Sequence, residues 1–299
     1  MRKLFALLIG SAMMMACSGE QGPTAKEIEA LDSAALKVAV MPTLDCLPLF
    51  VADASGLLQQ DGLDVRLRMY TAHMDCDTAV ARRAVEGTVT DLVRTERLRQ
   101  QGTPLQYVAV TNLSWQLVTS RSARIKQLKQ LDDKMVAMTR YSATALLADR
   151  AVDSAKLKSE RVFRIQVNDV NLRLSMLESN TIDALFLPEP QATQARNTRA
   201  FVLLDTREMN LQLGALAFRE DAMKDTTRQR QISQLLGIYN QACDSINDHG
   251  LDYYRDLIVS RCNVKPATVD SLMQGIRFDH VAAPKQSDID LAKDWLKKQ

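Results

Sequence analysis

The chain has 299 residues, of which 46% are hydrophobic and 25% charged, values that are ordinary for a soluble globular protein. The net charge is +2; removal of Arg2 and Lys3 reduces the 38 basic residues to 36, which balances the 36 acidic ones. This balance excludes an electrostatic basis for binding nucleic acid, and no segment after residue 16 is apolar for long enough to span a membrane.

The first 16 residues have the layout of a secretory signal peptide. Arg2 and Lys3 precede an apolar run that ends at Met15, and the small Ala16 follows. Residues 14–17 resemble a bacterial lipobox, with Met14 where leucine is more usual. This resemblance implies cleavage before Cys17 and lipidation of its thiol, which would anchor the chain to a bacterial membrane. Ordinary cleavage with a free thiol is the alternative. Residues 17–35 then form a flexible polar tether.

A strand-helix-strand unit is predicted between Lys37 and Tyr70. The apolar run 37–41 indicates a strand, which Pro42 ends because proline has no N–H for a neighbouring strand. Residues 47–58 have the spacing of a helix with one apolar face, and residues 63–69 alternate as a strand does. A helical crossover makes the two strands parallel, and open parallel sheets bind ligands at the carboxyl ends of their strands. The loops after these strands should therefore border a site.

The same pattern of alternating strands and helices continues along the chain. We expect a helix capped by Asp75 or Asp77 that ends at Gly87. Further strands are predicted at 88–91, 105–112, 115–120, 134–139, 162–167, 184–187, 201–205 and 211–218. Further helices are predicted at 92–101, 142–152, 170–179, 225–249, 251–262, 267–275 and 287–298.

Several of these segments resemble one protein family. The stretch KVAVMPTLDCLPLFVADASGLLQQDGLDVRLRMY (residues 37–70) is similar to the opening of type II periplasmic solute-binding proteins of the sulfonate, nitrate and thiamine-precursor group. IKQLKQLDDKMVAMTRYSATALLADRAVD (residues 125–153) resembles the start of the second lobe in that family, although a frequent glycine is absent. TDL (90–92) and LPEP (187–190) resemble segments of the family's ligand cleft.

The resemblance implies a two-lobed α/β fold in which each lobe is a mostly parallel sheet flanked by helices, followed by a helical C-terminal part. Residues 36–116 and 213–299 would form lobe 1, and residues 117–212 would form lobe 2. The chain passes between the lobes near Trp115 and returns near Leu213, so two connections make a hinge.

Four cysteines remain if Cys17 is lipidated. An exported chain lies in an oxidising compartment, so an even number of cysteines indicates two disulfides. We favour Cys46–Cys76 and Cys243–Cys262; buried free thiols are the alternative. A zinc site is not expected, because no two cysteines have ligand spacing and the chain has only three histidines.

Polar residues follow the predicted strands of both lobes, and their convergence at one edge of each sheet predicts a ligand cleft. Taken singly, each is equally well explained as a helix cap or turn residue. Trp115, at the start of the crossing, would be either a wall for a ligand ring or a packed hinge residue. The candidate ligand-binding residues are Thr43, Asp45, Thr71, His73, Thr90, Asp91, Trp115, Arg140, Tyr141, Ser142, Asn168 and Glu189.

The balance of charge among these candidates favours a ligand with an amine or a ring nitrogen. Asp45, Asp91 and Glu189 outnumber the single cation, Arg140. The alternative is an anion held by backbone N–H groups at a helix that starts near Ser142.

No catalytic constellation is present. His249 and His280 lie in the helical C-terminal part, and no phosphate-binding loop or nucleophile elbow occurs. We therefore expect a monomeric lipoprotein without cofactor or metal, in the periplasm or at the cell surface, which binds a small polar organic solute and delivers it to the permease and ATPase of an ABC importer. A ligand-sensing accessory lipoprotein and an enzyme on the same fold are the alternatives.

Overall fold

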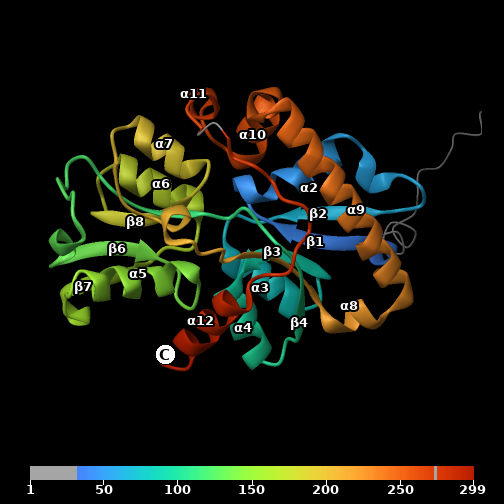
Figure 1. The fold of residues 1–299 in the computed structure, drawn as a ribbon, viewed down its shortest axis with the longest axis horizontal. Helices are drawn as coiled ribbons and strands as arrows, with labels where there is room; N and C mark the ends of the chain where they lie inside the picture. Colours follow the sequence, from blue (N-terminus) through green and yellow to red (C-terminus); the bar gives the residue numbers. More distant parts are fainter. Residues whose placement is uncertain (1–31, 273–274) are drawn as a thin grey trace, which may run out of the picture. The chain divides into compact units, whose positions relative to one another are not determined.

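The computed structural model describes residues 32–272 and 275–299, and from Leu36 onward it contains two five-stranded sheets (Figure 1). The strand orders are β2-β1-β3-β10-β4 and β7-β6-β8-β5-β9. We call the first sheet and its helices lobe 1, and the second sheet and its helices lobe 2. The strands are β1 (Leu36–Val40), β2 (Val65–Met69), β3 (Gly87–Asp91), β4 (Leu105–Val110), β5 (Trp115–Thr119), β6 (Lys134–Met138), β7 (Val162–Gln166), β8 (Ala184–Pro188), β9 (Phe201–Asp205) and β10 (Gly214–Arg219).

In each sheet four strands run in one direction and one strand runs in the other. In lobe 1, β1 pairs in parallel with β2 and β3, whereas β10 is antiparallel to both β3 and β4. In lobe 2, β6 pairs in parallel with β7 and β8, whereas β5 is antiparallel to β8 and β9. The reversed strands β5 and β10 are those that enter a lobe directly after a connection. The predicted two-lobed, mostly parallel α/β fold is confirmed.

Helices cover both faces of each sheet. α2 and α9 lie on one face of the first sheet, with α3 and α4 on the other; α5 lies on one face of the second sheet, with α6 and α7 on the other (Figure 1). The helices are α2 (Leu47–Ala54), α3 (His73–Ala81), α4 (Leu92–Gln100), α5 (Ala143–Ser154), α6 (Val170–Glu178), α7 (Gln191–Asn197), α8 (Glu220–Lys224), α9 (Thr226–His249), α10 (Arg255–Cys262), α11 (Pro266–Asp270) and α12 (Gln286–Leu296).

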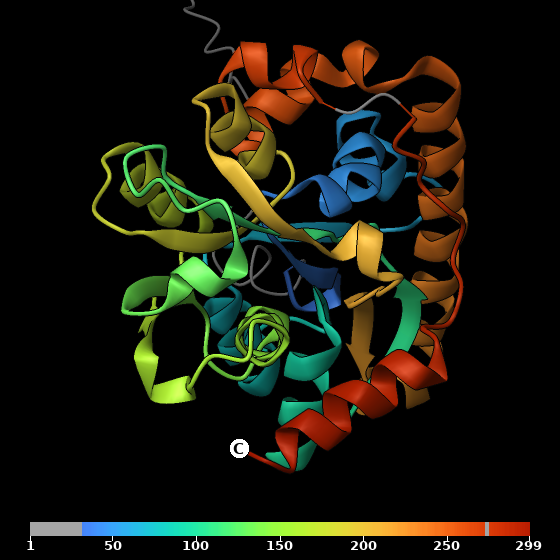
Figure 2. The ribbon, with the colours of Figure 1, turned by 60° about the vertical axis from the view of Figure 1, so that its left-hand side comes forward.

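The C-terminal part joins the two lobes. The segment before α12 runs along α9 (Figure 2), where the N–H groups of Phe278 and Val281 donate to Asn247 Oδ1 and Asn240 Oδ1 at 2.9 and 2.8 Å. α12 then packs beside α4 of lobe 1 and α5 of lobe 2, and Trp295 Nε1 donates to Asp149 Oδ2 at 2.8 Å. The apolar face of α12 therefore belongs to a core that contains residues of both lobes.

Several predicted boundaries are wrong by a few residues. α2 ends at Ala54 because Gly56 adopts a left-handed conformation with φ 71°, which breaks the helix four residues before the predicted end. β4 ends at Val110 and β10 begins at Gly214, so residues that we expected in strands form the connections instead. The helices at 251–262 and 267–275 are shorter than predicted, and α7 was not predicted.

Neither predicted disulfide is formed, because Cys46, Cys76, Cys243 and Cys262 are all free and buried. All four belong to the apolar core of lobe 1, where each thiol packs as a small apolar group. Cys46 Sγ accepts the N–H of Met41 at 3.4 Å, and the Cys243 thiol donates to the carbonyl of Asp279 at the same distance. Burial raises the pKa of every one of these thiols.

The described part of the chain has no helix with the length and apolar character needed to cross a membrane. Within those same residues, no group of histidines, cysteines and carboxylates is arranged to hold a metal ion. The predicted signal peptide, the lipidation site Cys17 and most of the tether lie outside the described residues.

Candidate functional site

The two connections between the lobes run side by side. The first comprises residues 111–114 and the second residues 206–213, and the N–H of Thr111 donates to the carbonyl of Gly214 at 3.1 Å. The N–H of Trp115 donates to Thr206 Oγ1 at 2.9 Å. Gly214 is required here, because a Cβ at this position would lie 2.4 Å from Leu113 Cβ and 2.4 Å from Thr111 Oγ1. The absence of a side chain at residue 214 therefore allows the connections to pack closely.

A cavity of about 390 Å³ lies beside these connections, and we call it the hinge cavity. Its volume falls in the range of small-molecule sites. Residues of both lobes border it, with Leu44 from lobe 1 and Glu189 from lobe 2, and Arg277 and Lys285 of the C-terminal segment complete its wall. The cavity combines an apolar surface from Leu44, Leu113 and Leu211 with the charged groups of Glu189, Arg207, Arg277 and Lys285.

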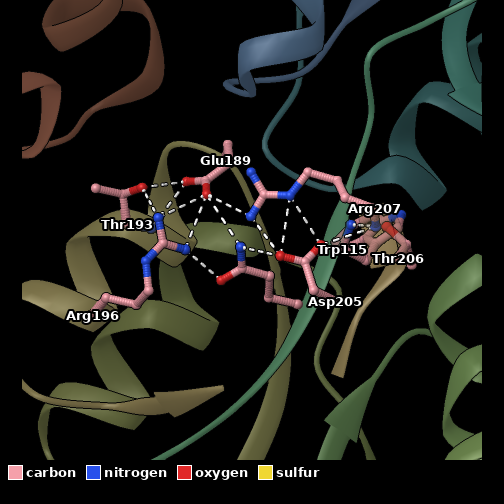
Figure 3. Close-up of polar contacts among 8 residues, drawn as sticks. Trp115, Glu189, Thr193, Arg196, Asp205, Thr206 and Arg207 are labelled. Carbon is pink, nitrogen blue, oxygen red and sulfur yellow. Dashed lines mark hydrogen bonds and ion pairs between the residues drawn. The ribbon is translucent and has the colours of Figure 1, made fainter. Parts of the chain in front are cut away.

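Glu189 is held in place by a network within lobe 2 (Figure 3). Its Oε2 accepts the backbone N–H and the hydroxyl of Thr193 at 3.0 and 2.7 Å, and its Oε1 accepts both terminal nitrogens of Arg196 at 3.0 Å. Gln116 Nε2 donates to Glu189 Oε1 at 3.3 Å and to Asp205 Oδ2 at 2.9 Å, and Asp205 forms an ion pair with Arg207. The network leaves Glu189 only 5% exposed, so its carboxylate is a fixed part of the cavity wall.

Away from the hinge cavity, the two lobes also contact each other directly at the ends of their strands. We call this region the strand-end contact. Asp91, the last residue of β3, accepts the N–H of Arg94 at 2.9 Å and the N–H of Ala143 at 3.1 Å on the same oxygen, Oδ1. These N–H groups are at the N-termini of α4 in lobe 1 and α5 in lobe 2. Burial raises the pKa of Asp91 to about 6, although the charge of Arg94 and both hydrogen bonds act to lower it.

Backbone contacts extend the strand-end contact across the interface. The N–H of Val170 donates to the carbonyl of Thr71 at 3.3 Å, and Ala72 forms an isolated antiparallel bridge with Asp169. At the border of the hinge cavity, the N–H of Leu44 donates to the carbonyl of Glu189 at 2.8 Å. Ends of parallel strands from the two lobes therefore face each other, as the strand directions predict.

A group of four buried side chains lies in the same interface, and we call it the arginine cluster: His73, Arg94, Trp115 and Arg173. The His73 and Trp115 rings are 6.0 Å apart between centroids. Burial and the positive charges of Arg94 and Arg173 hold the pKa of His73 well below its ordinary value, so His73 is neutral at pH 7. α3, α4 and α6 supply the other residues, and Trp115 begins β5.

The structure places the predicted site residues in different surroundings. Thr43, Asp45, Thr90, Ser142 and Glu189 are buried at strand ends, as are Asp91, His73 and Trp115. Asp45 Oδ2 accepts the hydroxyl of Thr111, while Asp45 Oδ1 and Thr90 Oγ1 have no partner within the described residues. Arg140, Tyr141 and Thr71 are exposed, and the half-buried Asn168 accepts a hydrogen bond from Gln166. Only Glu189 among the twelve candidates lines the hinge cavity.

Two features of the site escaped the sequence analysis. Arg207 lies between two predicted strands, and Arg277 and Lys285 lie between two predicted C-terminal helices. Arg94 and Arg173 were taken for ordinary helix residues, since periodicity alone gives no sign that a charged side chain is buried. The one available signal was that α4 follows β3 directly and that α6 follows β7 after a short loop.

The argument for a cationic ligand loses most of its support. Asp91 already accepts two backbone N–H groups, and Glu189 accepts hydrogen bonds from Thr193 and Arg196. The alternative anion site near Ser142 is likewise occupied, because the Asp91 carboxylate takes the N–H of Ala143. Asp45 has a buried oxygen, Oδ1, without a partner within the described residues.

Known structures with the same fold include several binding proteins. The alkanesulfonate-binding protein from Xanthomonas axonopodis pv. citri bound to MOPS is 15% identical, with a TM-score of 0.75 over 89% of this chain and 92% of that chain. The ligand-binding component of an ABC-type import system from Staphylococcus aureus with zinc bound is 14% identical, with a TM-score of 0.74 over 88% and 91%. The periplasmic nitrate-binding protein from Synechocystis PCC 6803 is 14% identical, with a TM-score of 0.68 over 85% and 74%.

At these identities the structural matches establish the fold alone. No curated protein has a significantly similar sequence. The family model described as NMT1/THI5 like matches residues 43–277. This range begins after β1 and includes all the later strands and both connections. It also includes the residues that line the hinge cavity up to Arg277. By this match the chain belongs to the NMT1/THI5-like family.

Proposed function

We propose that this protein binds a small polar organic solute in the hinge cavity and delivers it to the permease and ATPase of an ABC importer. The observation that carries the proposal is a cavity of about 390 Å³ bordered by both lobes and both connections. A ligand that touches both lobes binds their closed arrangement better than an open one, and it therefore shifts the population toward closure. Such a change gives a membrane transporter a means of recognising the loaded protein.

The binding proteins with the same fold support this proposal. They include an alkanesulfonate-binding protein, a nitrate-binding protein and the ligand-binding component of an ABC-type import system with zinc bound. The wall of the hinge cavity offers hydrogen-bonding groups and apolar surface in a form that suits reversible binding. We propose binding without chemical conversion, since Glu189 is fixed by Thr193 and Arg196 and has no histidine beside it.

A blocked cavity tests the proposal. We would purify the full chain from its native source and identify small molecules released on denaturation by mass spectrometry. Ser114 lines the cavity, so Ser114→Trp should fill it and abolish the released solute while the melting temperature stays close to that of the wild type. Ser287→Trp, at an exposed position of α12, is the matched control and should retain the solute. Equal solute in both variants would contradict binding in the hinge cavity.

We also propose that the protein acts outside the cytoplasm as a monomeric lipoprotein anchored through Cys17. The sequence of the first 17 residues supports this, since it combines a signal-peptide layout with a resemblance to a lipobox. Cys17→Ser should release the protein from the membrane fraction, which immunoblotting of separated fractions would measure. A variant that stays with the membranes would contradict the lipid anchor.

A further inference from the structure

The arginine cluster contains more hydrogen-bond donors than the protein provides acceptors for. Arg94 is fully buried; its Nε and Nη2 bond to Asp77, while its Nη1 has no partner within the described residues. Trp115 is 3% exposed, and its Nε1 is likewise without a partner there. A buried donor without an acceptor destabilises the folded protein, because it has lost its hydrogen bonds to water. Two of them in one interface indicate that an acceptor from outside the chain belongs there.

Arg173 adds a buried positive charge that forms no ion pair with another described residue. Its Nε donates to the carbonyl of Val167 at 2.7 Å and its Nη1 to the carbonyl of Phe186 at 3.1 Å, while its Nη2 donates to Thr139 Oγ1. All three acceptors are neutral; Val167 and Thr139 directly follow β7 and β6, and Phe186 is the middle residue of β8. Buried cations are ordinarily paired with an anion. Burial and the charge of Arg94 lower the pKa of Arg173 to about 9, which leaves it charged at neutral pH.

The carboxylates around the cluster have other roles. Asp77 is the ion-pair partner of Arg94, and Asp169 caps α6 by accepting the N–H of Leu172 at 2.8 Å. Asp91 is bound to the N-termini of α4 and α5. His73 is neutral. Asp169 attracts Arg173 electrostatically, but among the described residues the guanidinium of Arg173 forms hydrogen bonds to neutral acceptors alone.

We infer that the arginine cluster binds an acidic group of the solute, a carboxylate or a similar oxyanion, when the lobes close around it. The inference rests on the proposed function and names the chemical class of its ligand. The guanidinium of Arg173 and the Nη1 of Arg94 come from opposite lobes, so one anion bridges them and favours closure. The indole N–H of Trp115 supplies a third donor. The solute is thus an organic acid, with its remaining atoms toward the first connection, which ends just before Trp115.

The test uses methanesulfonate and acetate as probes, titrated by calorimetry into the purified full chain, with sodium chloride at equal ionic strength as the blank and methylammonium chloride as the cationic comparison. Wild type should bind at least one anion and not the cation. Arg173→Gln removes the unpaired charge and should weaken anion binding by about 10- to 150-fold, as expected for a charge-assisted hydrogen bond. Arg150→Gln, at an exposed position of α5, is the matched control and should keep the affinity within about twofold.

A second variant covers the case in which Arg173→Gln does not fold. Trp115→Phe keeps an aromatic ring but removes the indole N–H together with part of the ring system. It should weaken anion binding, and the protein should still unfold cooperatively at a lower melting temperature, because a buried ring becomes smaller. Unchanged anion affinity in Trp115→Phe and Arg173→Gln would overturn the inference. So would loss of affinity only in the double variant Arg277→Gln, Lys285→Gln, which would place the acidic group in the hinge cavity. Binding of a neutral or cationic solute alone would overturn the inference and leave the proposed function intact, whereas no solute of any charge would contradict both.

Discussion

The strand-end contact and the hinge cavity lie in one interface but use polar residues in opposite ways. At the strand-end contact, Asp91 satisfies two helix N-termini from different lobes, so the protein itself occupies a position that could bind an anion. At the hinge cavity, polar and charged groups line about 390 Å³ of open space. Glu189 links the two, because its carbonyl accepts the N–H of Leu44 while its carboxylate forms the cavity wall. A polar residue after a parallel strand is therefore as well suited to holding two lobes together as to binding a ligand.

The largest effect is expected at Glu189. Glu189→Ala removes the acceptor of Arg196 and Thr193 and should lower the free energy of unfolding by about 3 kcal/mol, as for a broken buried ion pair. Glu189→Gln keeps the shape of the side chain and one acceptor oxygen, so it should lower the free energy of unfolding by less. The measurement is urea denaturation, with Asp132→Ala as the control, since the ion pair of Asp132 with Arg161 is exposed and its loss should change little. An equal effect of Glu189→Ala and Asp132→Ala would show that the network in lobe 2 has no structural role.

Gly214→Ala should have the next largest effect, through the close packing of the connections. The added Cβ would lie 2.4 Å from Leu113 Cβ, and the resulting overpacking should cost about 1–3 kcal/mol. Gly237→Ala in α9 is the matched control, because a Cβ there meets no atom within 4 Å and alanine favours helix, so it should stabilise the protein by up to about 1 kcal/mol. Thermal unfolding should show a lower melting temperature for Gly214→Ala and a higher one for Gly237→Ala. An unchanged melting temperature in Gly214→Ala would mean that the connections can move apart to make room for the added Cβ.

Asp91 tests the strand-end contact. Asp91→Ala removes the N-cap of α4 and the bond to Ala143, which should cost about 1–2 kcal/mol. Asp91→Asn keeps the acceptor oxygen and cannot ionise. Because the folded-state pKa of Asp91 is raised to about 6, its contribution to stability is fully present below pH 4 and is lost as the pH rises through 6. The melting temperature of Asp91→Asn should therefore rise relative to wild type between pH 4 and pH 7.

An opposite pH trend, or a constant difference between Asp91→Asn and wild type, would show that the folded protein does not raise the pKa of Asp91. Asp91→Ala and Asp91→Asn together also distinguish the effect of the Asp91 hydrogen bonds on stability from the effect of its negative charge. If Asp91→Ala and Asp91→Asn were equally stable at pH 7, the hydrogen bonds to Arg94 and Ala143 would contribute nothing measurable.

Lys285 should show the smallest effect on stability. It is exposed at the edge of the hinge cavity, and its Nζ donates only to Asn210 Oδ1 at 3.1 Å. Lys285→Ala should change the free energy of unfolding by less than about 0.5 kcal/mol in chemical denaturation. A larger loss of unfolding free energy would mean that the wall of the cavity stabilises the folded protein as the strand-end contact does, and the two regions would no longer differ in this respect.

Much of the fold was accessible from the sequence because it depends on local periodicity. The alternation at 63–69 predicts the pairing partner of β1, although the strand begins only at Val65. The positions of the chain crossings were predicted near Trp115 and Leu213, and the connections lie there. α7 was missed, since its seven residues are rich in glutamine, threonine and arginine and carry too few apolar side chains to show a helical face.

The site was less accessible, since it depends on contacts between distant segments. The cysteines illustrate this: spacing along the chain suggested two disulfides, yet all four side chains point into the apolar core of lobe 1. The importance of Arg173 likewise depends on its contacts with Thr139, Val167 and Phe186, which come together only when three strands align. No local pattern distinguishes such an arginine from one on a solvated helix face.

The sequence by itself determined the order of strands and helices, the two crossings and the presence of polar residues after the strands, because backbone periodicity and breakers act within a few residues. Only the tertiary structure decided which of those polar residues are available to a ligand. Asp91 is engaged by Ala143, 52 positions away, and Asp45 by Thr111, 66 positions away. Whether a buried carboxylate or guanidinium has a partner is set by such long-range pairs, and the two arginines of the cluster meet only because their helices start at facing strand ends.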